Sequence, residues 1–520
     1  MMDSMAYPVA VVPIFVNAGT ALVPALLAGA ASLVAVLMRP RELVAVCRRR
    51  PMVPAVGVVA VAVLWWVIGA LMGSGQAVGR DGRRDWTKEA LQIMRREGSA
   101  TWPVVRVEGA NGRGAVVFRQ DYGRCGHDGG PAPVGLRALW EYKEPDGAMM
   151  LSSPAVVGDR VYGASSLQNV DGKIYGGIYC VDAGTGKQIW ATNEPLKAFF
   201  SSPALSADGK YLVIGQGLHD DKDCELLCLE TESGKVHWRV KTTLHVEGSP
   251  AIHGDMVVVG AGAIEGPDHK PTTDPGEVIA VRISDGMVLW RCQVNDPESS
   301  PAISKDGIVY IGSGFGGNAM VALRSECDED LKKNGLERVM WRTGLTYPVT
   351  GAVTLAGDRV IVGVGNSDFV YSAPHPAGVV AALDAKTGEV KWRTPMKDAV
   401  LGAVAYRDGK LICPVRTGEV VALNAEDGTE IWRQAVSGKS PVLAGPAFAG
   451  GYVYAVSRDG YLAVLDVNDG RVVERHGLND PANPGQDGLS LSSPMVAGGC
   501  VFVGSETGGL RCFIGGKGGS

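Results

Sequence analysis

One eleven-residue pattern recurs along the chain, and this repetition constrains the fold more than any other feature. Residues 382–392 read ALDAKTGEVKW and fit the pattern at every position. Four further copies end at a tryptophan, and two more tryptophans extend the series at intervals of 40 to 52 residues. The seven tryptophans are Trp140, Trp190, Trp238, Trp290, Trp341, Trp392 and Trp432. Periods of this length, each holding several short strands, are typical of a β-propeller.

A second marker falls between the tryptophans and raises the count of units to eight. It reads SSPAVVGDRVY in its first copy and degenerates in later ones. The eight copies begin at Ser152, Ser201, Gly248, Ser299, Thr350, Leu401, Ala444 and Ser492. Residues 402–434 show the clearest unit, with apolar runs separated by Asp-Gly and Thr-Gly turns, as in β-hairpins. The 71 glycines, which follow no collagen period, agree with many tight turns. The sequence therefore predicts an all-β, eight-bladed propeller.

The two ends of this repeat region predict how the ring closes. The last unit stops after LRCFIGG and lacks a fourth strand, whereas residues 136–143 form a fourth strand with no unit before it. Pairing the two completes eight blades of four strands.

The repeated tryptophans and glycines are interpreted as architecture. The Thr-Gly step makes the turn between the third and fourth strands, and the tryptophan wedges between neighbouring blades. The docking residues are the seven tryptophans together with Gly186, Gly234, Gly286, Gly388 and Gly428. Because they recur at equivalent places, they do not form the asymmetric constellation that catalysis needs.

The amino-terminal part has a different composition and predicts a membrane anchor. Residues 1–8 form a tail, and residues 9–38 and 53–72 are two uncharged apolar runs, each long enough to cross a bilayer of about 30 Å. The basic loop 39–52 is expected in the cytoplasm, although arginines also follow the second run. Residues 73–114 then form a linker with one short helix, and residues 115–520 form the propeller. We expect a multi-pass inner-membrane protein whose propeller lies in the periplasm or extracytoplasmic space.

The repeat resembles the tryptophan-docking motif of PQQ-like propellers. That superfamily includes the quinoprotein alcohol dehydrogenases and the non-enzymatic BamB proteins of outer-membrane assembly. The segment FRQDYGRCGHDGG, through Phe118, Arg119, Arg124 and Gly126, is similar to the lead-in of membrane-anchored members. The enzyme branch typically carries adjacent cysteines over its cofactor, but no two of the ten cysteines here are adjacent, and no Cys-x-x-Cys-His haem motif is present.

Loops between the second and third strands are longer in units one, two, three and five, so they form a rim on one face. Loops held on a rigid scaffold often carry binding sites. The candidate binding residues in them are Asp220, Asp221, Asp223, Glu265, Asp268, His269, Asp368 and His375. One interpretation of these residues is a calcium site or a patch that binds a partner. The other is ordinary solvated loops, which the absence of EF-hand spacing favours. No metal ligands and no catalytic residues are assigned.

Two functions from different classes remain open, with a ligand-sensing domain as a third option. The first is a non-catalytic, membrane-anchored, BamB-like scaffold that needs no cofactor and binds an envelope protein or polymer through its loop face. The alternative is a membrane-bound quinoprotein dehydrogenase that uses PQQ and calcium. A formal net charge of −5 gives no indication of a nucleic-acid partner.

Overall fold

The computed structural model describes residues 118–127, 129–144, 147–168, 174–192, 196–218, 221–262, 276–438, 440–482 and 490–516. The predicted tail, the spans 9–38 and 53–72, the loop 39–52 and the linker 73–114 lie outside the described residues. Within the described part, no helix has the length and apolar character needed to span a bilayer.

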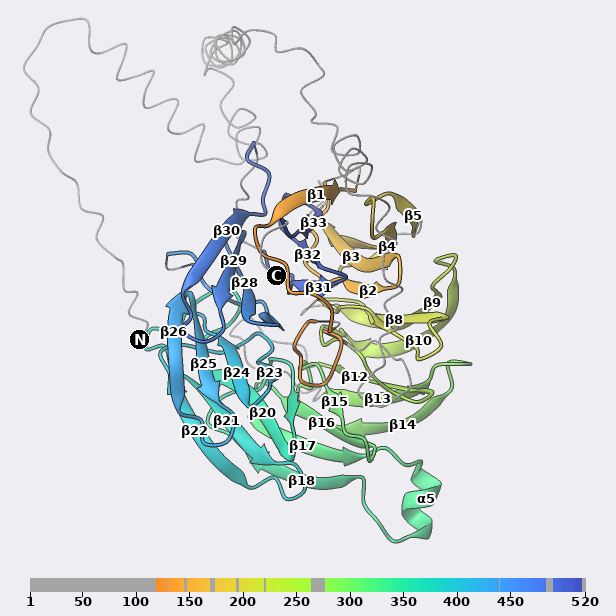
Figure 1. The fold of residues 1–520 in the computed structure, drawn as a ribbon. Coiled ribbons are helices and arrows are strands. Elements are labelled where there is room, and N and C mark those ends of the chain that lie inside the picture. The colour runs from red at the N-terminus through yellow and green to blue at the C-terminus, as the bar shows by residue number, and fades with distance from the viewer. Residues whose placement is uncertain are drawn as a thin grey trace, which may run out of the picture. The chain divides into compact units, whose positions relative to one another are not determined.

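Eight antiparallel sheets are arranged around a central axis, which confirms the predicted eight-bladed propeller (Figure 1). Blades 1 to 4 each run from an inner to an outer strand. Blade 1 consists of β2 (Ala155–Val157), β3 (Arg160–Gln168), β4 (Ile174–Asp182) and β5 (Gln188–Ala191), with β6 (Leu196–Lys197) added beside β4. Blade 2 consists of β7 (Ala204–Leu205), β8 (Tyr211–Gly215), β9 (Lys222–Glu230) and β10 (Val236–Leu244). Blade 3 consists of β11 (Ala251–His253), β12 (Met256–Ala261), β13 (Glu277–Arg282) and β14 (Val288–Gln293), and blade 4 of β15 (Ala302–Ile303), β16 (Ile308–Ser313), β17 (Ala319–Arg324) and β18 (Val339–Gly344).

Blades 5 to 7 repeat this order, and blade 8 is composite. Blade 5 consists of β19 (Thr354–Ala356), β20 (Arg359–Gly365), β21 (Gly378–Asp384) and β22 (Val390–Met396), and blade 6 of β23 (Ala405–Arg407), β24 (Lys410–Pro414), β25 (Glu419–Asn424) and β26 (Glu430–Ala435). Blade 7 consists of β27 (Ala447–Ala449), β28 (Tyr452–Ser457), β29 (Tyr461–Asp466) and β30 (Val472–Gly477). Blade 8 consists of β31 (Met495–Ala497), β32 (Cys500–Gly504), β33 (Leu510–Ile514) and the early strand β1 (Arg137–Tyr142). The helix α5 (Asp328–Lys333) lies in the long turn between β17 and β18.

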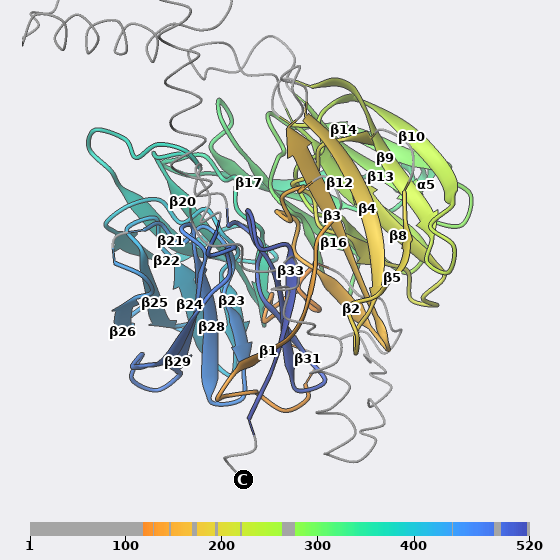
Figure 2. The same ribbon diagram turned by 90° about the horizontal axis from the view of Figure 1, so that it is seen from above.

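Ring closure follows the predicted pairing. The early strand β1 is antiparallel to the final strand β33, with Trp140 opposite Cys512. Figure 2 shows β1, β33 and β31 together from a second direction. The sheet therefore joins the amino-terminal and carboxy-terminal ends of the described propeller.

The repeated tryptophans lie between blades. Each donates its indole N–H to a backbone carbonyl of the following blade, as Trp140 does to Ala183 O at 2.9 Å and Trp341 to Ala385 O at 3.1 Å. The indole rings also lie against turn glycines. At Gly388, where φ is +72°, an added Cβ would come within 2.6 Å of the Trp341 ring. The turn thus needs glycine both for its backbone conformation and for its contact with the neighbouring blade.

Candidate functional site

The lead-in segment, residues 118–127, closes one end of the channel around which the blades are arranged. Its backbone carbonyls accept hydrogen bonds from the inner strands of four successive blades. These bonds come from Leu355 N to Tyr122 O at 2.8 Å, Tyr406 N to Gly123 O at 2.7 Å, Phe448 N to Cys125 O at 2.7 Å and Val496 N to Gly126 O at 2.8 Å. Figure 1 shows this stretch as the orange loop near the centre of the ring. We call residues 118–127 the plug.

Side chains of the plug extend the contacts to further blades. The Gln120 amide donates to Val156 O at 3.3 Å, and the Tyr122 hydroxyl donates to Ile252 O at 2.5 Å. Arg124 donates to Val353 O at 3.1 Å and Pro301 O at 2.6 Å, in blades 5 and 4, and to Phe118 O at 2.8 Å. These hydrogen bonds of the plug therefore reach seven of the eight described blades.

Both plug arginines are fully buried and act as donors to carbonyl groups. Arg119 binds Pro446 O and, at 3.0 Å, Arg124 O. Burial lowers the pKa of Arg119 to about 9 and that of Arg124 to about 10. Both guanidinium groups therefore remain charged at neutral pH, and their role is to hold the blades to the plug rather than to meet a ligand.

A pocket of about 950 Å³ lies in the channel, with Phe118 of the plug among its lining residues. That volume is in the range of small-molecule sites. Because each inner strand runs towards the plug, the pocket is bounded by the residues that precede these strands. These are the SSPA segments, which the sequence indicated only as a marker of the repeat.

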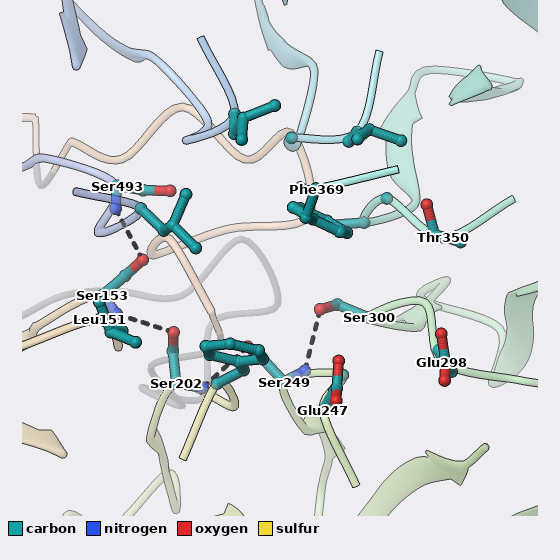
Figure 3. Close-up of a pocket in the computed structure, with 18 of the residues that line it drawn as sticks. Leu151, Ser153, Ser202, Glu247, Ser249, Glu298, Ser300, Thr350, Phe369 and Ser493 are labelled. Carbon is teal, nitrogen blue, oxygen red and sulfur yellow. Dashed lines mark hydrogen bonds between the residues drawn. The ribbon is translucent and has the colours of Figure 1, made fainter. Parts of the chain in front are cut away.

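One serine of each SSPA segment forms a hydrogen-bonded row around the pocket, the serine row (Figure 3). Each backbone N–H donates to the serine hydroxyl of the next blade. The row comprises Gly445 N to Ser493 Oγ (2.9 Å), Ser493 N to Ser153 Oγ (2.9 Å), Ser153 N to Ser202 Oγ (2.9 Å), Ser202 N to Ser249 Oγ (3.0 Å) and Ser249 N to Ser300 Oγ (2.9 Å). It ends where Ala352 and Ala403 occupy the equivalent positions in blades 5 and 6.

The residues two positions before the serine row form a second ring, the mouth ring, and all eight line the pocket. In blade order they are Leu151, Phe200, Glu247, Glu298, Thr350, Leu401, Leu443 and Leu491. Blades 6, 7, 8, 1 and 2 contribute a continuous apolar arc, and blades 3, 4 and 5 contribute a polar arc. The repeat therefore builds a two-sided ring at positions that the sequence analysis does not single out for binding.

The described parts of the longer loops of blades 2 and 5 lie at the open end of this pocket, as their position between second and third strands requires. Leu218 and Asp221 from the loop of blade 2, and Phe369 and Val370 from that of blade 5, line the pocket. Phe369 packs against the apolar cluster that includes Leu401. We call this side of the propeller the mouth face.

The candidate rim residues are only partly brought together. Asp221 lines the pocket, accepts from Leu218 N at 2.9 Å and lies 3.9 Å from Lys197 Nζ. Asp223 is exposed at a positive φ of 52° and does not line the pocket. Asp220, Glu265, Asp268 and His269 lie outside the described residues.

Asp368 and His375 help to shape the loop of blade 5. The Asp368 carboxylate accepts from Val370 N and Tyr371 N at 2.7 and 2.6 Å, and its carbonyl accepts from Arg416 Nε at 2.6 Å. His375 contributes its carbonyl to Asn366 Nδ2 at 2.8 Å. These contacts indicate that both residues order the loop rather than hold a metal.

The charged groups of the pocket do not fit a PQQ–calcium pair. Three carboxylates (Asp221, Glu247 and Glu298) and one ammonium (Lys197) line it. Lys197 lies beside Asp221, and Glu298 Oε1 is 2.7 Å from His245 Nε2. A tricarboxylate cofactor would meet an excess of like charge here, which is unfavourable at low dielectric unless a bound calcium ion offsets it. Among the described residues, no group of three or more His, Cys, Asp or Glu side chains is placed to hold a metal ion.

Comparisons with known proteins place this propeller in one family. The family model described as "Outer membrane protein assembly factor BamB" matches residues 174–326 and 376–518, more than half of the chain. The chain belongs to the BamB family. The curated BamB of Yersinia pestis is 23% identical over 350 residues, which cover 65% of this chain and 79% of the relative.

Solved structures agree on the fold. BamB from Moraxella catarrhalis superposes with a TM-score of 0.54 at 15% identity, covering 74% of this chain and all of that one. A europium-containing methanol dehydrogenase gives a TM-score of 0.55 at 13% identity, covering 77% and 92% of the two chains. Because both identities are low, these matches show a shared fold alone and leave the function to the site.

Sequence reasoning missed the plug and the mouth ring. The plug uses mainly backbone groups of the blades, which carry no side-chain signature. The mouth ring did have a signal, because Glu247 and Glu298 stand at a repeat position that is apolar in five other units. Comparing the repeats position by position would have shown it.

Proposed function

We propose that this chain is a non-catalytic, membrane-anchored scaffold whose mouth face binds an envelope protein on the extracytoplasmic side. The observation that carries the proposal is the chemistry of the mouth face. Val370 is 50% exposed and Tyr371 70% exposed in the loop of blade 5, and Tyr175 and Tyr461 expose 36% and 43% on blades 1 and 7. Tyrosine is enriched in protein interfaces because it offers a large apolar area and a polar end.

Membership of the BamB family supports this function. The relatives are named as outer-membrane protein assembly factors, and we propose that this chain serves in the assembly of envelope proteins as well. The predicted spans 9–38 and 53–72 would fix the propeller to the inner membrane. The basic loop 39–52 supports an orientation with the propeller outside the cytoplasm.

The apolar arc of the mouth ring further supports binding over redox catalysis. Where chemistry would require converging polar groups, blades 6, 7, 8, 1 and 2 supply Leu and Phe. A PQQ- and calcium-dependent dehydrogenase remains the alternative to be tested, and the charges of the pocket disfavour it. The proposal needs no cofactor.

A photo-crosslinking experiment in cells tests the proposed face. A photoreactive phenylalanine analogue replaces Tyr371 on the mouth face or, as the matched control, Leu336, which is 42% exposed near α5 on the opposite face. We expect a discrete adduct with an envelope protein from position 371 and none from position 336. Adducts from position 336 alone would show that the partner binds elsewhere.

A further inference from the structure

The pocket has a distribution of charge and apolar surface that specifies a class of ligand. Its wall at the level of the mouth ring is divided into the apolar arc and the polar arc, and the two glutamates are contributed by adjacent blades. Figure 3 shows Glu247 and Glu298 beside Ser249 and Ser300, on a different side of the pocket from Leu151. A ligand that fills the pocket must therefore contact both kinds of surface.

The charge of the pocket is one-sided. Among the described residues that line it, Lys197 is the single cationic side chain, and Asp221 lies 3.9 Å from it. Glu247 and Glu298 add two further carboxylates on the polar arc, where Glu298 is 6% exposed and its Oε1 lies 2.7 Å from His245 Nε2. At such partly buried sites, the attraction for an opposite charge is several times stronger than in water. A positively charged group is therefore favoured on this side.

The opposite side favours an apolar body. Leu401 and Leu443 are buried at 4% exposure and form a cluster with Ala399, against which Phe369 and Leu491 pack. Burial of an apolar ligand surface here would contribute roughly 25 cal/mol per Å². The plug closes the far end, so the ligand would enter from the mouth face and remain in contact with both arcs.

We propose that the channel pocket binds a hydrophobic organic cation, with its charge towards Glu247 and Glu298 and its apolar body against the leucines of blades 6 to 8. This inference concerns the pocket and is independent of the protein-binding role of the outer rim. Binding of such a ligand is not a step of any redox reaction. It would occupy the channel mouth, next to the blade 5 loop that carries Tyr371.

A pair of probes of equal shape and opposite charge tests the proposal. Tetraphenylphosphonium, a cation, and tetraphenylborate, an anion, are titrated into the purified full-length chain by isothermal titration calorimetry. We expect saturable binding of the cation and at least tenfold weaker binding of the anion. No saturable binding of the cation, or equal affinity for both probes, would overturn the proposal.

Variants locate the binding to the pocket. Glu247→Gln should weaken cation binding about threefold or more, because it removes one nearby charge. Leu491→Asn should weaken it by removing apolar contact. The matched control is Glu389→Gln, whose carboxylate is exposed in a turn away from the pocket. This variant should bind as the unaltered chain does, as should Glu247→Asp, which keeps the charge. An unchanged affinity in Glu247→Gln, or an equal loss in Glu389→Gln, would contradict the proposed position of the cation.

Discussion

Replacement of Arg124 by methionine tests whether the plug holds the ring together. The guanidinium group donates to carbonyls of blades 4 and 5 and to Phe118 within the plug. Hydrogen bonds from a charged donor contribute about 1.5 to 3 kcal/mol each to stability. Methionine has a similar length but leaves these carbonyls without their donor.

An opposing effect reduces the expected loss. Burial lowers the pKa of Arg124 to about 10, which corresponds to a net cost of roughly 3 kcal/mol for the buried charge that the apolar variant does not incur. Three lost hydrogen bonds exceed this relief, so Arg124→Met should lower the free energy of unfolding by about 1.5 to 6 kcal/mol.

Urea unfolding of the full-length chain, followed by tryptophan fluorescence, measures the change. The matched control is Arg393→Met, because Arg393 is exposed on the outer strand of blade 5. Its effect should stay within about 0.5 kcal/mol. If Arg124→Met unfolds at the same urea concentration as the unaltered chain, the plug does not stabilise the ring and the reasoning is wrong.

Three further predictions concern the blades. In urea unfolding, Gly388→Ala should destabilise the protein by about 1 to 3 kcal/mol more than Gly409→Ala. Both glycines have positive φ, but only a Cβ at position 388 would meet Trp341. Equal losses of stability in the two variants would argue against docking of the tryptophan on this turn. Trp140→Ala should cost about 3 to 5 kcal/mol in the same assay because the 3% exposed indole fills the joint where the ring closes, and a loss below about 1 kcal/mol would contradict that role. Burial raises the pKa of the Cys413 thiol, so above about pH 8.5 the unfolded chain releases a proton that the native protein retains. The free energy of unfolding should therefore fall as pH rises, by up to about 1.4 kcal/mol per pH unit from this group. In Cys413→Ala, unfolding midpoints measured from pH 7.5 to 10 should fall less steeply, and an identical slope would refute the assignment.

The architecture could be predicted because the side chains that build it recur at equivalent positions in successive blades. The tryptophan series and the SSPA marker predicted eight units, and the unpaired strand around Trp140 predicted the closure that β1 and β33 make. Each of these signals recurs at a regular interval, so every copy strengthens the others. The predicted spans 9–38 and 53–72 stay predictions, because they lie outside the described residues.

The site was harder to predict because it depends on differences between repeats and on backbone groups. The sequence indicates the acidic loop residues as binding candidates, but of the described ones only Asp221 lines the pocket. Glu247 and Glu298 lie within the repeat itself, where residues at equivalent positions are interpreted as architecture. The contacts of the plug join residues up to 370 positions apart through carbonyl groups, and no residue pattern predicts them.

We propose above all that this propeller binds partners and does not oxidise substrates. The most direct measurement is a titration of the purified full-length chain with PQQ and Ca²⁺, in which cofactor fluorescence and reduction of an electron-accepting dye by alcohols and sugars are followed together. We predict no saturable cofactor binding and no dye reduction above the blank. Saturable binding with substrate-dependent dye reduction would contradict the claim and establish the chain as a quinoprotein dehydrogenase.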